Sequence, residues 1–63
     1  MTKREIKRTA KRLAELELII QNSEDVDERR AAQEETIDIC NRYSDLADME
    51  KIDAEVLKIF NQS

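Results

Sequence analysis

Apolar side chains recur with a helical period through the first third of the chain. At 100° per residue they gather on one side of a helix, and they are Ile6, Ala10, Leu13, Leu16 and Ile20. Thr2 followed by Glu5 has the spacing of a capping box, which marks a helix start. The pattern predicts a first helix over about residues 3–21.

Polar residues with turn chemistry interrupt this period at residues 22–25, whose sequence is Asn-Ser-Glu-Asp. Asn, Ser and Asp side chains compete with the helical backbone for hydrogen bonds, and they favour turns and caps. Either Ser23 or Asp25 can cap a following helix. We therefore expect a turn over 22–25 and a second helix over about 26–48.

The second predicted helix has a wide apolar face. Its apolar positions span nearly half of the helical wheel and include Val26, Ala32, Ile37, Ile39, Cys40, Tyr43, Leu46 and Ala47. A face of that breadth can pack against two neighbours at once, which a lone hairpin does not require. This breadth favours assembly with a second chain.

A shorter apolar pattern closes the chain. Asp53 has the position of an N-cap, with Ile52 before it and Leu57 at the fourth helical position as a hydrophobic staple. These residues predict a short third helix over about 53–61. Because no Gly or Pro forces a break, a continuous second and third helix is the alternative.

Length and composition restrict how such helices can be stabilised. A chain of 63 residues makes one small domain, and such a domain buries only about 60% of the surface that its unfolded state exposes. One cysteine and no histidine exclude an internal disulfide and an ordinary zinc site, which leaves oligomerisation as a source of stability.

These features predict an all-α fold for the single domain 1–63. We expect an antiparallel helical hairpin plus a short C-terminal third helix, assembling as a dimeric helical bundle. The candidate core and dimer residues are Ile6, Leu13, Leu16, Ile20, Ile37, Cys40, Tyr43, Ala47, Leu57 and Phe60.

The residue types that usually carry catalysis are poorly represented. Cys40 lies on an apolar face and no histidine is present to activate it, so we expect a buried structural thiol. The carboxylates follow a solvated helical face, and a chain without glycine has no glycine-rich phosphate loop. We therefore expect that the protein is not an enzyme and that it has no cofactor and no metal site.

No apolar run reaches the ~20 residues that a membrane span needs. No signal-peptide pattern opens the chain. A single free thiol is also typical of a reducing compartment. These observations favour a cytoplasmic protein without a membrane partner.

A basic ridge occupies the start of the chain. Its cations recur every four residues, mostly opposite the apolar side of the first helix, and they are Lys3, Arg4, Lys7, Arg8, Lys11 and Arg12. One interpretation pairs the flanking Lys3 and Arg12 with acids near the end of the second helix. Those acids are Asp45, Asp48 and Glu50. A second interpretation is contact with nucleic-acid phosphates, with strong salt dependence and little sequence specificity.

The rest of the chain is acidic. Residues 13–63 hold 14 acids and 5 bases, and regularly spaced carboxylates form an acidic stripe on the second helix. The acidic stripe consists of Asp27, Glu34, Asp38, Asp45 and Asp48. A protein partner of complementary charge is therefore a third interpretation. Its minor form is an acidic helix that mimics DNA and occupies the groove of a nucleic-acid-binding protein.

Part of the chain resembles the plasmid RNA-binding Rop (Rom) family of helical-hairpin dimers. The resemblance is carried by the Met-Thr-Lys opening and by Asp38-Ile39-Cys40 with Asp45, Ala47 and Asp48. It implies two long helices that dimerise. The first helix of that family would run through residues 22–25, where this chain has turn chemistry. The aromatic residue of the family's RNA-binding face has no counterpart on the basic ridge, so no functional residue is carried over.

Together these features predict a small, non-catalytic, intracellular binding or regulatory protein. It would act on a protein partner through its charged helical faces and would form a homodimer. Nucleic-acid binding through the basic ridge is the alternative function. The candidate functional residues are therefore those of the basic ridge and the acidic stripe.

Overall fold

The computed structural model describes residues 2–62, and these form three helices without a strand, so the all-α prediction is confirmed. α1 spans Lys3–Asn22, α2 spans Val26–Arg42 and α3 spans Leu46–Gln62. The first and last residues of the chain lie outside the described part.

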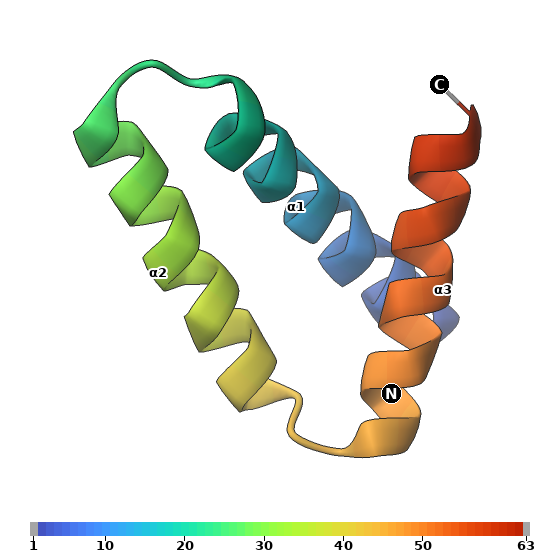
Figure 1. The fold of residues 1–63 in the computed structure, drawn as a ribbon. Coiled ribbons are helices and arrows are strands. Elements are labelled where there is room, and N and C mark those ends of the chain that lie inside the picture. The colour runs from blue at the N-terminus through green and yellow to red at the C-terminus, as the bar shows by residue number, and fades with distance from the viewer. Residues whose placement is uncertain (1, 63) are drawn as a thin grey trace.

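α1 is the central element of the fold (Figure 1). α2 runs antiparallel along one side of α1, and α3 packs against its other side. α2 and α3 meet at their short connection and then diverge, so α1 makes nearly all of the interhelical contacts. The first two helices thus form a hairpin, and the third folds back onto its first member.

Side-chain caps start α1 and α2. The Thr2 hydroxyl accepts a hydrogen bond from the Glu5 amide at 3.2 Å. Asp25 Oδ1 accepts from the amides of Asp27 at 2.9 Å and Glu28 at 3.4 Å. Both caps satisfy amides that the first turn of a helix leaves without a backbone partner. These two helix starts therefore follow from local side-chain chemistry.

The predicted second helix over 26–48 is wrong beyond Arg42, where α2 ends. Asp45 begins α3 instead, because its Oδ1 accepts from the Ala47 amide at 2.9 Å and its carbonyl accepts from the Met49 amide at 3.0 Å. Ser and Asp side chains favour such a break. The apolar spacing continues through it without interruption, so periodicity alone does not reveal it.

α3 is consequently longer than the predicted short helix over 53–61. It has 17 residues, and Asp53 lies inside it rather than at its N-cap. Ile52, expected before the helix as part of a staple, is fully buried in the contact with α1. The third helix is therefore a full packing partner of α1.

The core consists of two small clusters on two sides of α1. Their buried members are Ile6, Ala10 and Ile52 in one cluster, and Leu16, Ala32 and Ile39 in the other. The half-buried side chains of Leu13 and Tyr43 contact both clusters and join them. Within residues 2–62, the largest fully buried side chains are Leu16 and Ile52. A core this small gives the single chain limited stability.

The candidate core residues differ widely in exposure. Ile6 and Leu16 are buried, whereas the half-buried members are Leu13, Ile20, Tyr43 and Phe60. The single chain leaves Ile37, Cys40, Ala47 and Leu57 exposed, so these four candidate core or dimer residues are not part of its own core. Ala47 belongs to the first turn of α3 rather than to α2. The other three lie on sides of α2 and α3 that α1 does not cover.

Replacing Asp45 by alanine removes the side-chain cap of α3. We expect Asp45→Ala to lower the free energy of unfolding by about 1 kcal/mol, as loss of an N-cap does in other proteins. Urea denaturation followed by far-ultraviolet circular dichroism measures the change. Asp38→Ala is the matched control, since it removes an exposed carboxylate from the interior of α2. Equal effects of the two substitutions would contradict the capping role of Asp45.

Candidate functional site

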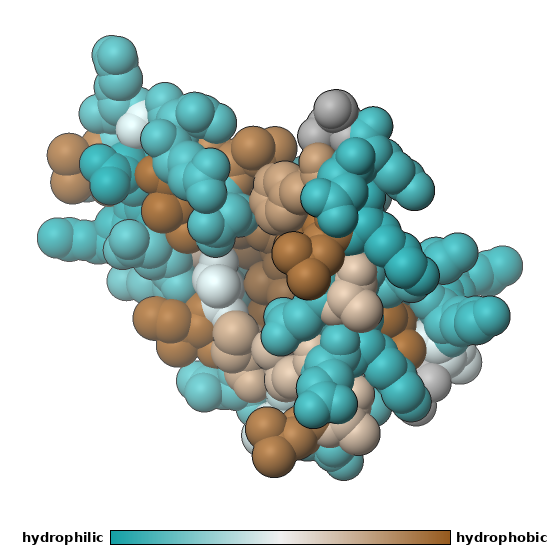
Figure 2. Space-filling model, turned by 45° about the vertical axis from the view of Figure 1, so that its right-hand side comes forward, coloured by the Kyte–Doolittle hydropathy of each residue, from teal (hydrophilic) through white to brown (hydrophobic). Residues whose placement is uncertain are grey.

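An open apolar groove lies between α2 and α3, with α1 as its floor. It has a volume of about 380 Å³, and its lining residues are Leu13, Glu17, Gln21, Thr36, Cys40, Met49, Asp53, Val56, Leu57 and Phe60. On the face drawn in Figure 2, apolar side chains gather in a hollow between polar lobes. The groove exists because α2 and α3 both pack on α1 but scarcely on each other.

The apolar lining of the groove is accessible from outside. Leu57 is 62% exposed, and Cys40 on the facing helix is exposed as well. Leu13, Met49 and Val56 are half-buried beneath them. An apolar surface with a polar rim is typical of sites that bind another helix. The groove is therefore the first candidate site. The helical periodicity of the sequence could not locate it, because periodicity does not show which other helices each face of a helix contacts.

The charged residues of the groove lining are both acids, Glu17 of α1 and Asp53 of α3. Glu17 Oε1 accepts a hydrogen bond from Gln21 Nε2 at 3.0 Å, along the same helix. Within the described part of the chain, no Lys or Arg lines the groove. Its rim is thus suited to cationic groups rather than to anionic ones.

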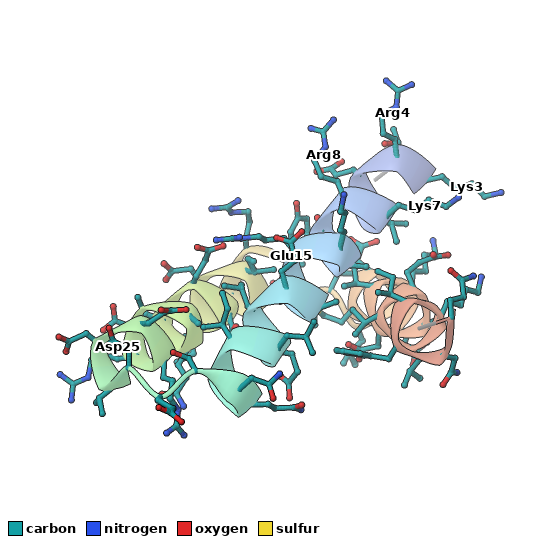
Figure 3. The ribbon with its side chains drawn as sticks, turned by 90° about the horizontal axis from the view of Figure 1, so that it is seen from above. Lys3, Arg4, Lys7, Arg8, Glu15 and Asp25 are labelled. Atoms are coloured by element: carbon teal, nitrogen blue, oxygen red, sulfur yellow. The ribbon has the colours of Figure 1, made fainter. Side chains whose placement is uncertain are left out.

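The six cations of the basic ridge are all exposed, but they extend in different directions. Figure 3 shows Arg4 and Arg8 projecting away from the three helices. Lys3 and Lys7 lie toward α3 and line a surface hollow with that helix. The structure therefore does not keep the basic ridge together as one surface.

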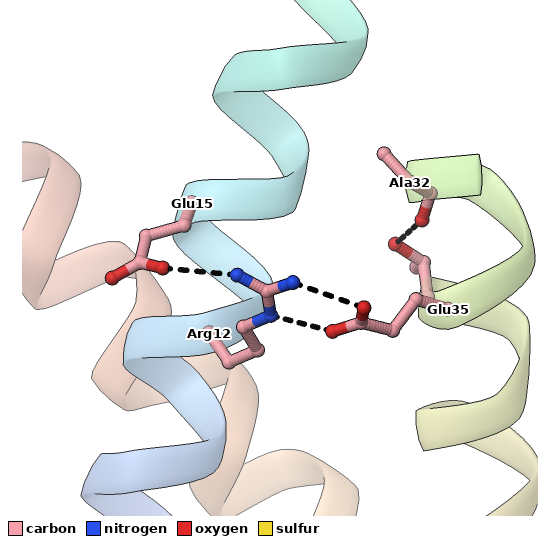
Figure 4. Close-up of polar contacts among 5 residues, drawn as sticks. Arg12, Glu15, Ala32 and Glu35 are labelled. Carbon is pink, nitrogen blue, oxygen red and sulfur yellow. Dashed lines mark hydrogen bonds and ion pairs between the residues drawn. The ribbon is translucent and has the colours of Figure 1, made fainter. Parts of the chain in front are cut away.

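Arg12, the last cation of the basic ridge, faces α2. Its Nη2 donates to Glu35 Oε1 at 2.9 Å, its Nε donates to Glu35 Oε2, and its Nη1 lies 3.3 Å from Glu15 Oε2 (Figure 4). Two parallel bonds to one carboxylate are a strong and specific geometry for arginine. Hydrogen bonding from Arg12, together with its positive charge, lowers the pKa of Glu35. The same contacts raise the pKa of Arg12.

The acids expected to pair with Lys3 and Arg12 are not their partners. Arg12 reaches Glu35, near the middle of α2, rather than the acids around residues 45–50. Lys3 forms no ion pair within residues 2–62. The predicted pairing with acids at the end of the second helix is therefore wrong. α2 ends at Arg42, so those acids lie between α2 and α3 or within α3. Arg12 is therefore a tie between α1 and α2.

The acidic stripe is divided between two helices. Asp27, Glu34 and Asp38 are exposed on α2 at spacings of seven and four residues, which keep them on one face. Asp48 is half-buried in α3, and Asp45 caps that helix. The three α2 carboxylates therefore remain as a candidate partner face, whereas Asp45 has a structural role.

Cys40 is exposed at the groove, so the expected buried thiol is wrong. Among residues 2–62, no group of three or more His, Cys, Asp or Glu side chains is arranged to hold a metal ion. None of the helices in this range combines the length and the apolar character that crossing a membrane requires. The candidate functional features of the described residues are the groove and the charged faces.

Comparison with protein-family models, curated proteins and solved structures finds no match to this chain. The structure also departs from the pattern of the Rop family. Residues 23–25 leave the helix where that family's first helix would continue, and a third long helix follows the hairpin. Because the fold has three helices instead of two, its own surfaces are the basis for a functional proposal.

Removing the Glu35 carboxylate should destabilise the fold in a pH-dependent way. Because Arg12 lowers the pKa of folded Glu35, the pair stabilises the fold at pH values above the ordinary glutamate pKa of about 4.5. That contribution is lost as the pH falls through the lowered value. We expect Glu35→Gln to be less stable than the natural chain at neutral pH, and the difference to shrink in strong acid. Thermal unfolding of both chains at neutral pH and in strong acid measures this difference in stability.

Glu34→Gln is the control for this prediction. Glu34 is the neighbouring exposed carboxylate, and it makes no ion pair within residues 2–62. Its substitution should change stability little at either pH. A Glu35→Gln deficit of the same size at both pH values would contradict the role of the Arg12 pair.

Proposed function

We propose that this chain is a small, non-catalytic binding protein that recognises a helical segment of another protein. The observation that carries the proposal is the open groove between α2 and α3, which exposes apolar side chains on a very small fold. A groove between two helices accepts the apolar face of an amphipathic helix. A regulatory protein that acts by occupying its partner needs such a surface and no reactive group.

The lining of the groove sets the chemistry of the partner. Its aliphatic and thioether side chains suit apolar anchors at positions i, i+3, i+4 and i+7 of a helix. Glu17 and Asp53 border it from α1 and α3, so Lys or Arg residues beside the anchors gain favourable contacts. We therefore propose a basic amphipathic helix as the partner.

The charged face of α2 supports the same partner charge. Asp27, Glu34 and Asp38 are exposed along it, and the chain as a whole has a net charge of −4. A surplus of one charge sign raises the association rate of an oppositely charged partner, and salt reduces the effect. In this proposal the acidic face steers the partner and the groove holds it.

A designed basic peptide tests the groove directly. The probe is a helical peptide with leucines at positions i, i+3, i+4 and i+7 and lysines on its other side, and fluorescence anisotropy measures its affinity. We expect Leu57→Ser to weaken binding by about tenfold or more, because burial of one leucine contributes about 1.5–3 kcal/mol and about 1.4 kcal/mol is a factor of ten in affinity. Since Leu57 is 62% exposed, its substitution should leave the fold intact.

Leu46→Ser is the matched control for the groove. Leu46 lies on the same helix and is 81% exposed, but it does not line the groove. A peptide with glutamates in place of the lysines should bind more weakly than the basic peptide. Equal affinity of the natural chain and Leu57→Ser, or a preference for the acidic peptide, would contradict the proposal.

We also propose that the chain forms a homodimer, because its own core is small. Val26 and Ile37 are 66% and 58% exposed on α2, and they lie roughly three turns apart on one side of it. Neither lines the groove, so pairing of α2 with α2 of a second copy leaves the groove open. Pairing through the groove is disfavoured because it would bring Glu17 and Asp53 of both copies together.

Sedimentation equilibrium at micromolar concentration tests the dimer. We expect the natural chain to sediment as a dimer and Ile37→Lys to sediment as a monomer, because a charge replaces the exposed apolar contact. Leu46→Ser should remain dimeric. A folded monomer of the natural chain would contradict the dimer without affecting the peptide test of the groove.

A further inference from the structure

Two lysines of α3 extend the basic surface of α1 across the boundary between these helices. Two surface hollows follow this boundary: one is lined by Lys3, Lys7 and Lys51, and the next by Lys7, Lys11 and Lys58. Lys51 and Lys58 are seven residues apart and therefore share one side of α3. We name these five residues of α1 and α3 the lysine seam.

The lysine seam is a concentration of positive charge on an acidic molecule. All five of its lysines are exposed. Lys58 Nζ lies 3.3 Å from Glu55 Oε1, which is the one ion pair of the seam within residues 2–62. In that same range, Glu55 is also the one acid that lines the two hollows. Five lysines thus face one acid on a chain whose net charge is −4.

The lysine seam offers little apolar surface. The apolar residues of the two hollows are Ile6, which is buried, Ile59, which is half-buried, and the small Ala54. Protein interfaces draw most of their energy from buried aromatic and other large anchors. Helices that bind at a membrane surface use exposed Trp, Phe or Leu. Interfaces with nucleic acid are more polar and more positive, which is the composition of the seam.

We propose that the lysine seam binds the phosphodiester backbone of a nucleic-acid duplex. Lysines one helical turn apart on α1 are separated by about 6 Å along the helix axis, so several can contact phosphates of one strand. Lysine contacts with phosphates carry no base information, so the binding is independent of sequence. A single strand is disfavoured because, within the described residues, no aromatic side chain lines the seam to stack on bases.

This site is independent of the proposed groove function. Lys51 and Lys58 lie on one side of α3, whereas Leu57 and Phe60 line the groove on another side. A duplex and a partner helix can therefore bind at the same time. Failure of the peptide test leaves the lysine seam unaffected, and failure of the duplex test leaves the groove unaffected.

The salt dependence of duplex binding tests the lysine seam. Fluorescence anisotropy of a short, labelled, mixed-sequence DNA duplex gives the association constant at a series of salt concentrations. The logarithm of this constant should fall against the logarithm of salt with a slope of about −3 to −4, since each neutralised phosphate contributes about −0.9. An RNA duplex of the same length should behave alike.

Lys51→Gln combined with Lys58→Gln removes the α3 part of the seam. We expect this variant to bind the duplex about tenfold more weakly at low salt. The slope of the logarithm of its association constant against the logarithm of salt should be less negative by about 1 to 2. Arg29→Gln combined with Arg30→Gln is the matched control, because it removes the same charge from exposed positions of α2. Circular dichroism establishes that both variants are folded.

Two outcomes would overturn the proposal. One is equal loss of duplex binding in the two double variants, which would show a general charge effect instead of a site. The other is the absence of duplex binding at low salt. Vesicles that contain phosphatidylserine form a separate arm, and binding to them without binding to the duplex would assign the seam to membranes instead.

Discussion

The packing of α1 against both other helices is the constraint on which the rest of the structure depends. Ala10 is fully buried in the contact with α3, and Leu16 is buried in the contact with α2. Leu13 lies between these contacts and touches both clusters. Because α1 packs against both helices, α2 and α3 are each held in place by α1 and scarcely contact each other. The cost is a small core, in which alanines occupy several of the buried positions.

The surfaces of the molecule follow from this arrangement. Where α2 and α3 diverge, their facing sides form the apolar groove with its acidic rim. Where α3 crosses the other edge of α1, lysines of the two helices meet. Arg12 belongs to neither surface, because its bidentate pair with Glu35 uses it to tie α1 to α2. The charges of the chain are thus divided among one structural pair, the acidic rim of the groove, the acidic face of α2 and the lysine seam.

Local chemistry made some elements predictable and concealed others. Thr2 and Asp25 are caps that act within three residues, and the helix starts beside them can be inferred from the sequence. Asp45 caps α3 in the same way, yet the apolar period runs on through it and predicts a longer second helix. At this position the apolar period predicts that the second helix continues, whereas the Asp45 cap starts a new helix. The structure has the new helix, which the hydrogen bond from the Ala47 amide to Asp45 stabilises. The acidic stripe lost its continuity for the same reason.

The sequence by itself determined that the chain is all-α, where its first two helices begin and that its cations and acids are separated along the chain. These properties depend on interactions within one or two helical turns. Only the tertiary structure decided that Cys40 and Leu57 face a groove instead of a core, and that Lys51 and Lys58 join the lysines of α1. The physical reason is that a helical period orients side chains about their own axis, whereas burial depends on where the other helices lie.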